Sequence, residues 1–344
     1  MTHLKKTALA VGIALTLGSG IGIGHAQTTL TLSNWVPPNH FVSTEILGAW
    51  AEQVEEATEG RVRIRMLPSA VGSPEQHWEL ARMGVADITW GNFTYEPIRF
   101  KSLWFAELPL TGSNAVASSV ALWETLQEHL VDDSAFQGVK LLGAGLFGGG
   151  SLHHGSRPMV APEDLRNQKL RMGGPIQREL LEGFGAVPVA APATRAYEML
   201  ESGVVDGSLH PLESVIGFRL ESQLGHHTLF PGGFYDASFF IGMNKRKWNS
   251  LSEADQAAIM SVSGEHLSRH WGERFNDQTQ SAEAQLRELG NQFHEPTEAL
   301  LEKTREMREA MLASWAEDMA KMGYDDPMAI VDFYESRYQA LDSE

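Results

Sequence analysis

Strand-like segments alternate with helical segments along most of this chain, and this order restricts the fold more than any other feature of the sequence. Residues 28–34 and 61–67 alternate apolar and polar side chains, while residues 41–58 between them have apolar side chains at helical spacing. A similar succession of strands and helices follows residue 163. This order is typical of an α/β fold with mainly parallel sheets. From Ser252 the pattern is helical, which predicts long C-terminal helices that brace the protein from outside.

The first 26 residues have the order of a secretory signal peptide. Lysines at 5 and 6 precede an apolar run over residues 8–23, and small residues follow at 24 and 26. The run is short and glycine-rich for a membrane anchor. The chain has no cysteine, so it offers no site for an N-terminal lipid and no disulfide. We therefore expect cleavage after Ala26 and a soluble, periplasmic mature protein.

The charge excludes some classes of partner. The chain has 27 basic and 44 acidic residues, a formal net charge of −17, and removal of Lys5 and Lys6 gives 25 − 44 = −19. A protein of this charge does not hold nucleic acid or an anionic membrane by bulk electrostatics. Any site for an anion must therefore be local and strong.

Three motifs that suggest enzymes or metal sites lack the context they need. The sequence GAGLFG at 143–148 follows a predicted strand, but GGSLHHGSRP after it cannot form the helix of a dinucleotide site. Neighbouring histidines on a strand, as at 153–154 and 226–227, point to opposite faces and do not share a metal. No nucleophile elbow follows the signal peptide. We expect no cofactor, metal site or catalytic residue, although the many Ser, His and Asp residues leave a catalytic triad open. Residues 143–148 are interpreted as a glycine-rich crossing between two lobes.

Arg171 lies in the short strand-like run Lys169–Met172, which otherwise suits a core. A buried arginine needs a partner for its charge. That partner is either an acidic residue of the protein or a ligand carboxylate, which the guanidinium matches at two points. The local sequence leaves both interpretations open.

Aromatic residues follow three predicted strands, where pockets form in α/β proteins. Each alone is explained by core packing, but together they favour a pocket with aromatic walls. The predicted wall residues are Trp35, Trp90, Asn92, Phe93, Phe234 and Tyr235.

A series of spaced motifs resembles the extracytoplasmic solute-binding proteins of TRAP transporters, the DctP-like family. The segments "TEGRV" at 58–62 and "KWNSLSEADQAAI" at 247–259 are also similar to this family. With the signal peptide, the resemblance covers nearly the whole chain. The motifs, in order, are Pro162-Asp164-Leu165, Lys169-Arg171, Val187-Pro188-Val189, Tyr197-Leu200 and Val205-Asp206-Gly207.

The resemblance implies a two-lobed periplasmic binding protein of type II-like architecture, whose lobes are joined by crossing strands and close on a ligand. We place residues 27–150 plus about 236–275 in lobe I, and residues 151–235 plus about 276–344 in lobe II. A monomer that docks on a TRAP-type membrane permease is expected. The family's arginine, which pairs with a ligand carboxylate, corresponds to Arg171.

Two departures from relatives narrow the ligand. His210 stands where many relatives have an asparagine that contacts the ligand, and Ser151 stands where sialic-acid-type relatives have a second arginine. His153 is also predicted to contact the ligand. A small keto, hydroxy or aromatic acid, or a zwitterion, is therefore favoured over a sugar acid. His210 and acids such as Asp236 also leave an amine open.

The sequence thus predicts a non-catalytic protein that captures a small organic acid for a TRAP permease. Two alternatives remain. The same scaffold could bind a zwitterionic or amine solute, or the chain could be an exported α/β hydrolase acting on a carboxylate substrate. The second alternative needs a nucleophile–base pair near Arg171, and no spacing in the sequence supplies one.

The signal peptide is testable directly. Exported protein should begin at Gln27, because the small residues before it fit signal peptidase. Intact-mass spectrometry of the periplasmic fraction measures this. Recovery of a chain that still carries Met1 in the membrane fraction would contradict the prediction.

Overall fold

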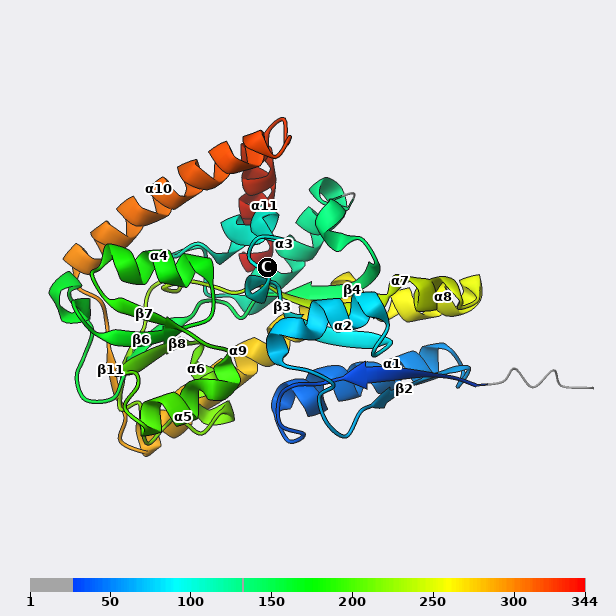
Figure 1. Ribbon diagram of the computed structural model, residues 1–344, viewed down its shortest axis with the longest axis horizontal. Coiled ribbons are helices and arrows are strands. Elements are labelled where there is room, and N and C mark those ends of the chain that lie inside the picture. Colours follow the sequence, from blue (N-terminus) through cyan, green and yellow to red (C-terminus); the bar gives the residue numbers. More distant parts are fainter. Residues whose placement is uncertain (1–26, 132, 344) are drawn as a thin grey trace, which may run out of the picture.

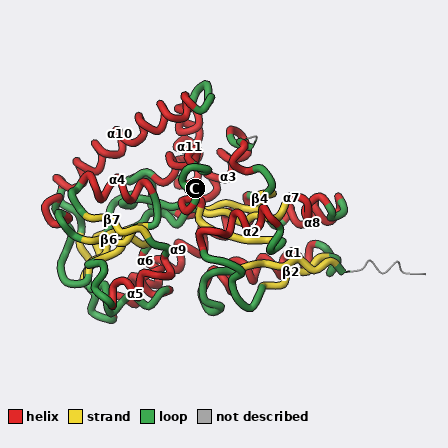
Figure 2. Tube along the Cα trace, in the orientation of Figure 1, coloured by secondary structure: helices red, strands yellow, loops and turns green. Residues whose placement is uncertain are grey.

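The computed structural model describes residues 27–131 and 133–343, and in it two β-sheets lie at either end of a central junction (Figure 1). The predicted signal peptide, residues 1–26, lies outside the described residues. Helices cover both sheets, as the α/β pattern of the sequence predicts (Figure 2).

The first sheet has five strands and is built largely from the N-terminal half. The segment that follows β1 is a wide helical turn, Val42–Gly48, which continues into α1 (Ala49–Ala57). The sheet's other helices are α2 (His77–Met83), α3 (Ala115–His129), α7 (Lys245–Asn249) and α8 (Glu253–Ser261). In spatial order the strands are β2 (Val62–Met66), β1 (Thr28–Ser33), β3 (Ile88–Asn92), β10 (Phe239–Asn244) and β4 (Val139–Gly145).

The second sheet has six strands and carries the Arg171 strand near one edge. Its helices are α4 (Pro175–Gly183), α5 (Ala196–Glu201) and α6 (Leu212–Gly217). In spatial order the strands are β11 (Gln292–His294), β9 (His226–Thr228), β5 (Ser151–His154), β8 (Gly207–His210), β6 (Lys169–Met172) and β7 (Val187–Ala190).

Both sheets are mixed, which differs from the mainly parallel sheets expected from the sequence. β10 runs antiparallel to β3 and β4, and β5 runs antiparallel to β8 and β9. The remaining pairings are parallel. The antiparallel strands, β5 and β10, are the ones by which the chain enters one sheet directly from the other. Such a strand arrives without the crossover helix that makes neighbours parallel.

Two of the connections between the sheets run together at the junction. Gly150 N–H donates to Tyr235 O at 2.6 Å, and Phe234 N–H donates to Gly150 O at 2.8 Å. The carboxylate of Asp236 accepts the backbone N–H groups of residues 147, 148 and 149 at 3.1, 3.1 and 3.0 Å. This acid therefore ties the two crossing segments to each other. The glycine-rich crossing predicted at 143–148 is found slightly later, at 146–150, because residues 143–145 belong to β4.

Glycine is required where the crossings touch. Gly149 and Gly233 have φ of 97° and 83°, a region that other residues adopt at a cost. A Cβ at Gly233 would lie 2.5 Å from Cα of Gly149, and a Cβ at Gly149 would lie 2.8 Å from Cα of Gly233. The two backbones therefore leave no room for a side chain at either position.

The C-terminal helices link the parts, as predicted. α9 (Glu265–Glu288) packs on α3 and β4 of the first sheet and on α6 of the second, through an apolar stripe that includes Leu267, Trp271 and Phe275. α10 (Glu298–Lys321) runs along the outside from α4, and α11 (Pro327–Asp342) packs on α3 (Figure 1). The residues expected in lobe II thus include a helix that contacts the first sheet's side of the molecule.

Gly233→Ala should reduce the free energy of unfolding by about 2–5 kcal/mol, because the new methyl group meets backbone and also disfavours positive φ. Gly290→Ala is the matched control. Gly290 has φ of 85° and nothing within 4 Å of its Cβ position, so it should cost only about 1–2 kcal/mol. Urea unfolding followed by circular dichroism measures both. Equal losses would show that the close approach at Gly233 is unimportant.

Candidate ligand-binding site

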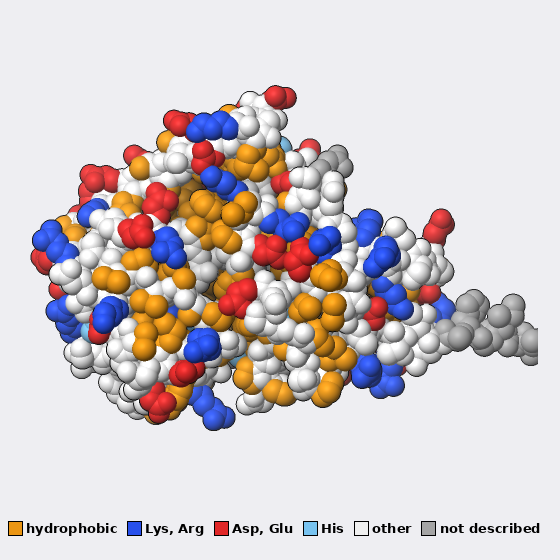
Figure 3. Space-filling view, viewed as in Figure 1, with side chains coloured by type: hydrophobic (Ala, Val, Ile, Leu, Met, Phe, Trp, Pro, Cys, Tyr) orange, Lys and Arg blue, Asp and Glu red, His pale blue; other side chains and the backbone are white. Residues whose placement is uncertain are grey.

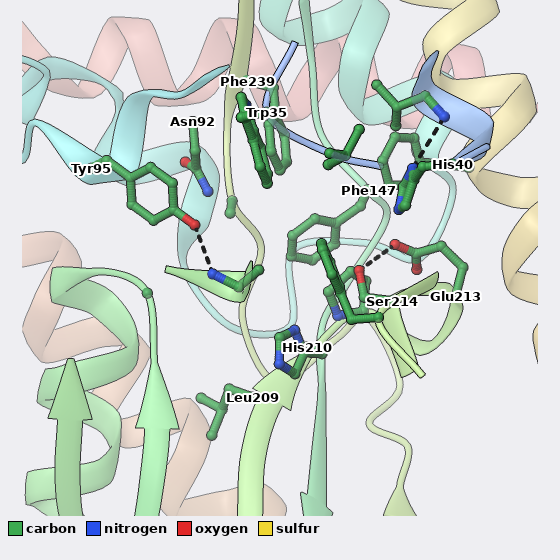
Figure 4. Close-up of a pocket in the computed structure, with 18 of the residues that line it drawn as sticks. Trp35, His40, Asn92, Tyr95, Phe147, Leu209, His210, Glu213, Ser214 and Phe239 are labelled. Atoms are coloured by element: carbon green, nitrogen blue, oxygen red, sulfur yellow. Dashed lines mark hydrogen bonds between the residues drawn. The ribbon is translucent and has the colours of Figure 1, made fainter. Parts of the chain in front are cut away.

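A cavity lies at the junction between the sheets, walled by residues from both. The space between its walls is about 570 Å³, part of it open to solvent. Figure 4 shows Asn92 and Tyr95 on one side of it, and His40, Glu213 and Ser214 on the other. Its lining includes Trp35, Val36, His40, Val42, Trp90, Asn92, Tyr95, Phe147, Arg171, Gly173, Gln177, Leu209, His210, Glu213, Ser214, Phe218, Tyr235 and Phe239.

Arg171 is 4 % exposed and lines this cavity from β6. Its Nε donates to Ala191 O at 2.9 Å, and Nη1 donates to Leu209 O at 3.0 Å. Neutral carbonyls fix the orientation of the guanidinium but do not cancel its charge. No carboxylate in residues 27–131 or 133–343 forms an ion pair with it. The structural ion pair considered from the sequence is therefore absent from the described residues.

The phenols of Tyr95 and Tyr235 lie near the guanidinium. Burial lowers the pKa of Arg171 from its ordinary value, and the phenols of Tyr95 and Tyr235 act against that shift. A Cβ at Gly173 would lie 3.3 Å from Nη2 of Arg171 and 3.7 Å from Cε1 of Tyr95, so glycine keeps the space beside Nη2 open. Unlike two carboxylates, these neutral phenols leave the positive charge in place for an anion.

Aromatic rings form the opposing wall. Trp35 and Trp90 stack with centroids 4.5 Å apart and planes inclined by 19°, and Phe239 lies 6.3 Å from the Trp90 ring. Nε1 of Trp90 donates to Asn34 Oδ1 at 2.9 Å, which fixes the ring's orientation. Flat rings at such spacing suit a planar apolar group. The cavity therefore combines one buried cation with an aromatic surface.

The end of the cavity away from Tyr95 holds polar groups with little charge. Burial lowers the pKa of His40 to about 4 and raises the pKa of Glu213 to about 7. Burial, and next the charge of Arg171, hold the pKa of His210 well below its ordinary value. The two imidazoles are therefore neutral at neutral pH, and Glu213 is close to half protonated.

The structure brings together six of the ten residues predicted for the site. Those that line the cavity are Trp35, Trp90, Asn92, Arg171, His210 and Tyr235. They come from strands of both sheets and from the crossing segment, so residues far apart in the sequence meet at the ends of neighbouring strands.

The other four predicted residues lie outside the cavity wall. Phe93 packs in a second aromatic core beside Phe100, because it follows Asn92 and faces the opposite way. Phe234, next to Tyr235, likewise turns away and packs on Phe230 at 4.6 Å. In each pair the extended chain sends adjacent side chains to opposite faces.

Ser151 and His153 are held within the second sheet. Ser151 is buried opposite His210 in the β5–β8 pairing. His153 lies 2.7 Å from His227 Nδ1 through its own Nδ1, and its Nε2 donates to His210 O at 3.0 Å. The histidine pairs of the sequence thus contact each other within the sheet. No group of three or more acidic or histidine side chains that could hold a metal occurs among the described residues.

Four important wall residues were missed from the sequence: His40, Tyr95, Gln177 and Glu213. For three of them, closeness to the end of a strand could have indicated the position. His40 follows β1, Tyr95 follows β3 and Glu213 follows β8, each within seven residues of the strand's end. Asp236, which was considered for an amine ligand, binds backbone N–H groups of the crossing and is not part of the cavity lining.

On the face of the molecule that Figure 3 shows, acidic and basic side chains are interspersed. Within the described residues, none of the helices has the length and apolar composition needed to span a membrane.

Comparisons with known proteins agree with this geometry. The crystal structure of a TRAP periplasmic solute-binding protein from Bordetella bronchiseptica with bound (R)- and (S)-mandelate is 34% identical, covers 92% of this chain and 100% of its own, and superposes with a TM-score of 0.88. A marine-metagenome TRAP solute-binding protein specific for aromatic acid ligands, in complex with metahydroxyphenylacetate, is 26% identical, with coverage of 92% and 100% and a TM-score of 0.86.

Among curated proteins, the outer membrane transporter protein TsaT of Comamonas testosteroni is 28% identical over 315 residues, which are 91% of this chain and 93% of that protein. The model of the DctP family, described as bacterial extracellular solute-binding protein, family 7, matches residues 32–321. The match covers most of the chain and agrees with the two-sheet fold and its central cavity. The chain therefore belongs to the family 7 bacterial extracellular solute-binding proteins, the receptor family of TRAP transporters.

Proposed function

We propose that this protein captures a small aromatic monocarboxylate in the periplasm and delivers it to the membrane permease of a TRAP transporter. The observation that carries the proposal is Arg171, a buried cation that lines the cavity without a carboxylate partner in the described residues. A ligand carboxylate supplies the missing charge and fits the guanidinium at two points.

The aromatic character of the ligand follows from the opposite wall. The stacked pair Trp35–Trp90, with Phe239 beside it, offers flat apolar surface. Two similar proteins were crystallised with aromatic acids, one with mandelate and one with metahydroxyphenylacetate. A benzene ring with one carboxylate matches both the aromatic wall and the single buried cation. A dicarboxylate would leave its second charge without a cationic partner among these lining residues.

Delivery to the permease depends on closure of the sheets around the ligand. Tyr95, beside the first sheet, accepts the backbone N–H of Ala193, beside the second, at 3.2 Å (Figure 4). A ligand held between Arg171 and the aromatic wall contacts both sides and so favours this closed arrangement. The permease then receives the closed, loaded form, and family membership supports this partner. We propose that the protein acts as a monomeric receptor and not as an enzyme.

Arg171→Ala should weaken binding of benzoate or mandelate by about 30-fold to several thousand-fold, because it removes one partner of a desolvated charge pair worth about 2–5 kcal/mol. Arg171→Lys should also bind poorly, since a point charge does not reproduce the fork. The melting temperature without ligand should not fall, because a buried unpaired charge is lost. Isothermal titration calorimetry and thermal unfolding measure the two properties.

Arg178→Ala is the matched control for this experiment. Arg178 lies on α4, seven residues further along, with its side chain 47% exposed and paired with Glu182 at 3.7 Å, so its loss should leave affinity unchanged. Binding by Arg171→Ala within threefold of wild type would reject the carboxylate assignment. Chromatography of the recovered ligand tests the remaining alternative, because chemical conversion of the acid would identify a hydrolase instead.

Affinity for a monocarboxylate should also depend on pH through Glu213. Its pKa of about 7 means that it is mostly neutral at pH 6 and ionised at pH 9. Ionisation adds a negative charge to the cavity, so the Kd for benzoate should rise by about three- to tenfold over this interval. Glu213→Gln should abolish most of the rise.

Calorimetry at both pH values measures this dependence in the two proteins. Asp236, whose pKa burial raises to about 8, is common to wild type and variant and cancels in the comparison. An equal pH dependence in Glu213→Gln would exclude Glu213 as the responsible group.

A further inference from the structure

His40 and Glu213 separate two cavities. Both residues line the ligand cavity, and both also line a second, more polar cavity beyond it. The second cavity is bordered by Asn39, Glu45, Arg219, Gln278 and Gln285, among others. The pair therefore forms the inner end of the ligand cavity, across from Tyr95 and the Arg171 that lies beside it (Figure 4).

Hydrogen bonding fixes the tautomer of His40. The backbone N–H of Val42 donates to His40 Nδ1 at 3.2 Å, so Nδ1 is the acceptor. The neutral ring then carries its proton on Nε2. His40 is 8% exposed, and Nε2 is buried without a hydrogen-bond partner among the described residues. Gly217 faces this atom, and a Cβ there would approach Nε2 to 2.8 Å. His40 thus presents an unused donor.

Glu213 presents the complementary group. Ser214 donates its hydroxyl to Glu213 Oε1 at 2.9 Å. Oε2 is buried and has no partner in the part of the chain that the structure describes, while the whole residue is 4% exposed. Oε2 accepts a hydrogen bond when the acid is ionised and donates one when it is protonated.

These atoms are costly to leave unpaired, since a buried polar group without a partner loses its hydration for nothing. The titratable groups next along the cavity, His210 and Tyr235, are neutral, and both interact with the charge of Arg171. A ligand ammonium would meet the Nε2–H donor of His40, and a second carboxylate would meet Glu213 in its ionised form. A hydroxyl group suits both, because it accepts from His40 and either donates to Glu213 or accepts from it.

We propose that His40 and Glu213 form a subsite for a hydroxyl group of the ligand, so that the protein prefers a hydroxylated aromatic acid to the unsubstituted parent acid. This inference rests on the proposed function, because it takes the ligand carboxylate to be held by Arg171. The inference specifies a hydroxyl group at the other end of the ligand and the two residues that select it.

The test compares acids that differ only in one hydroxyl group. Calorimetry would measure Kd for benzoate and its 2-, 3- and 4-hydroxy isomers, and for phenylacetate with 3- and 4-hydroxyphenylacetate. At least one hydroxylated acid should bind ten or more times more tightly than its parent. In Glu213→Met and His40→Phe that ratio should fall below threefold.

Glu107→Gln is the matched control. Glu107 is also a buried acid, and burial also raises its pKa to about 7, but it contacts Thr94 and Ser238 and does not line the cavity. Its substitution should leave the hydroxyl ratio unchanged. If Glu213→Met does not fold, Glu213→Leu removes both side-chain oxygens with a side chain of similar size and should lower the ratio at least threefold.

Several results would overturn the subsite. One is a wild-type Kd for each parent acid that lies within threefold of the Kd for every hydroxylated acid. Another is a preference that survives both His40→Phe and the Glu213 variants. Tighter binding of isophthalate or 3-(aminomethyl)benzoate than of any hydroxylated acid would show that the inner end takes a charged group. Absence of binding by all these acids would instead reject the proposed function, and the subsite with it.

Discussion

A buried guanidinium without an acidic partner is the interaction on which the rest of this structure depends. Arg171 is 4% exposed, and carbonyl oxygens of Ala191 and Leu209 orient it without neutralising it. Burying a charge in this way is unfavourable unless something completes it. In the function proposed above, a ligand carboxylate does so. The chain's formal net charge of −17 repels anions at long range, so the site depends on this one short-range contact.

The fold places that charge at the junction between the two sheets. Arg171 belongs to the second sheet, while Trp35 and Trp90 belong to the side of the first. The connections between them meet at Gly149 and Gly233, where only glycine leaves room. The carboxylate of Asp236 holds the crossing segments together through backbone N–H groups. The joint is therefore tightly packed at its centre, and the closure proposed above takes place around it.

The cavity is divided by chemistry along its length. Near Tyr95 it offers a cation, along its middle it offers flat aromatic rings, and near Glu213 it offers buried polar atoms that are close to neutral. Each region obtains its character from burial, which penalises charge at His40 and Glu213 but cannot remove it from an arginine. A ligand with one carboxylate at one end of an aromatic ring satisfies the first two regions together.

The sequence by itself determined the α/β class, a glycine-rich crossing and the C-terminal helices, because these depend on local periodicity and on residue chemistry. It singled out Arg171 as a buried charge, and the family resemblance assigned that charge to a ligand. The predicted strand ends pointed to Trp35, Trp90, Asn92 and Tyr235, and the family resemblance pointed to His210. Tertiary structure decided which side chain of each adjacent pair faces the cavity, as with Asn92 and Phe93 or Tyr235 and Phe234. It also decided that both sheets are mixed, and that His40 and Glu213, 173 residues apart in sequence (213 − 40), share one wall. Those outcomes depend on the direction of a strand and on contacts between distant segments, which no local pattern encodes.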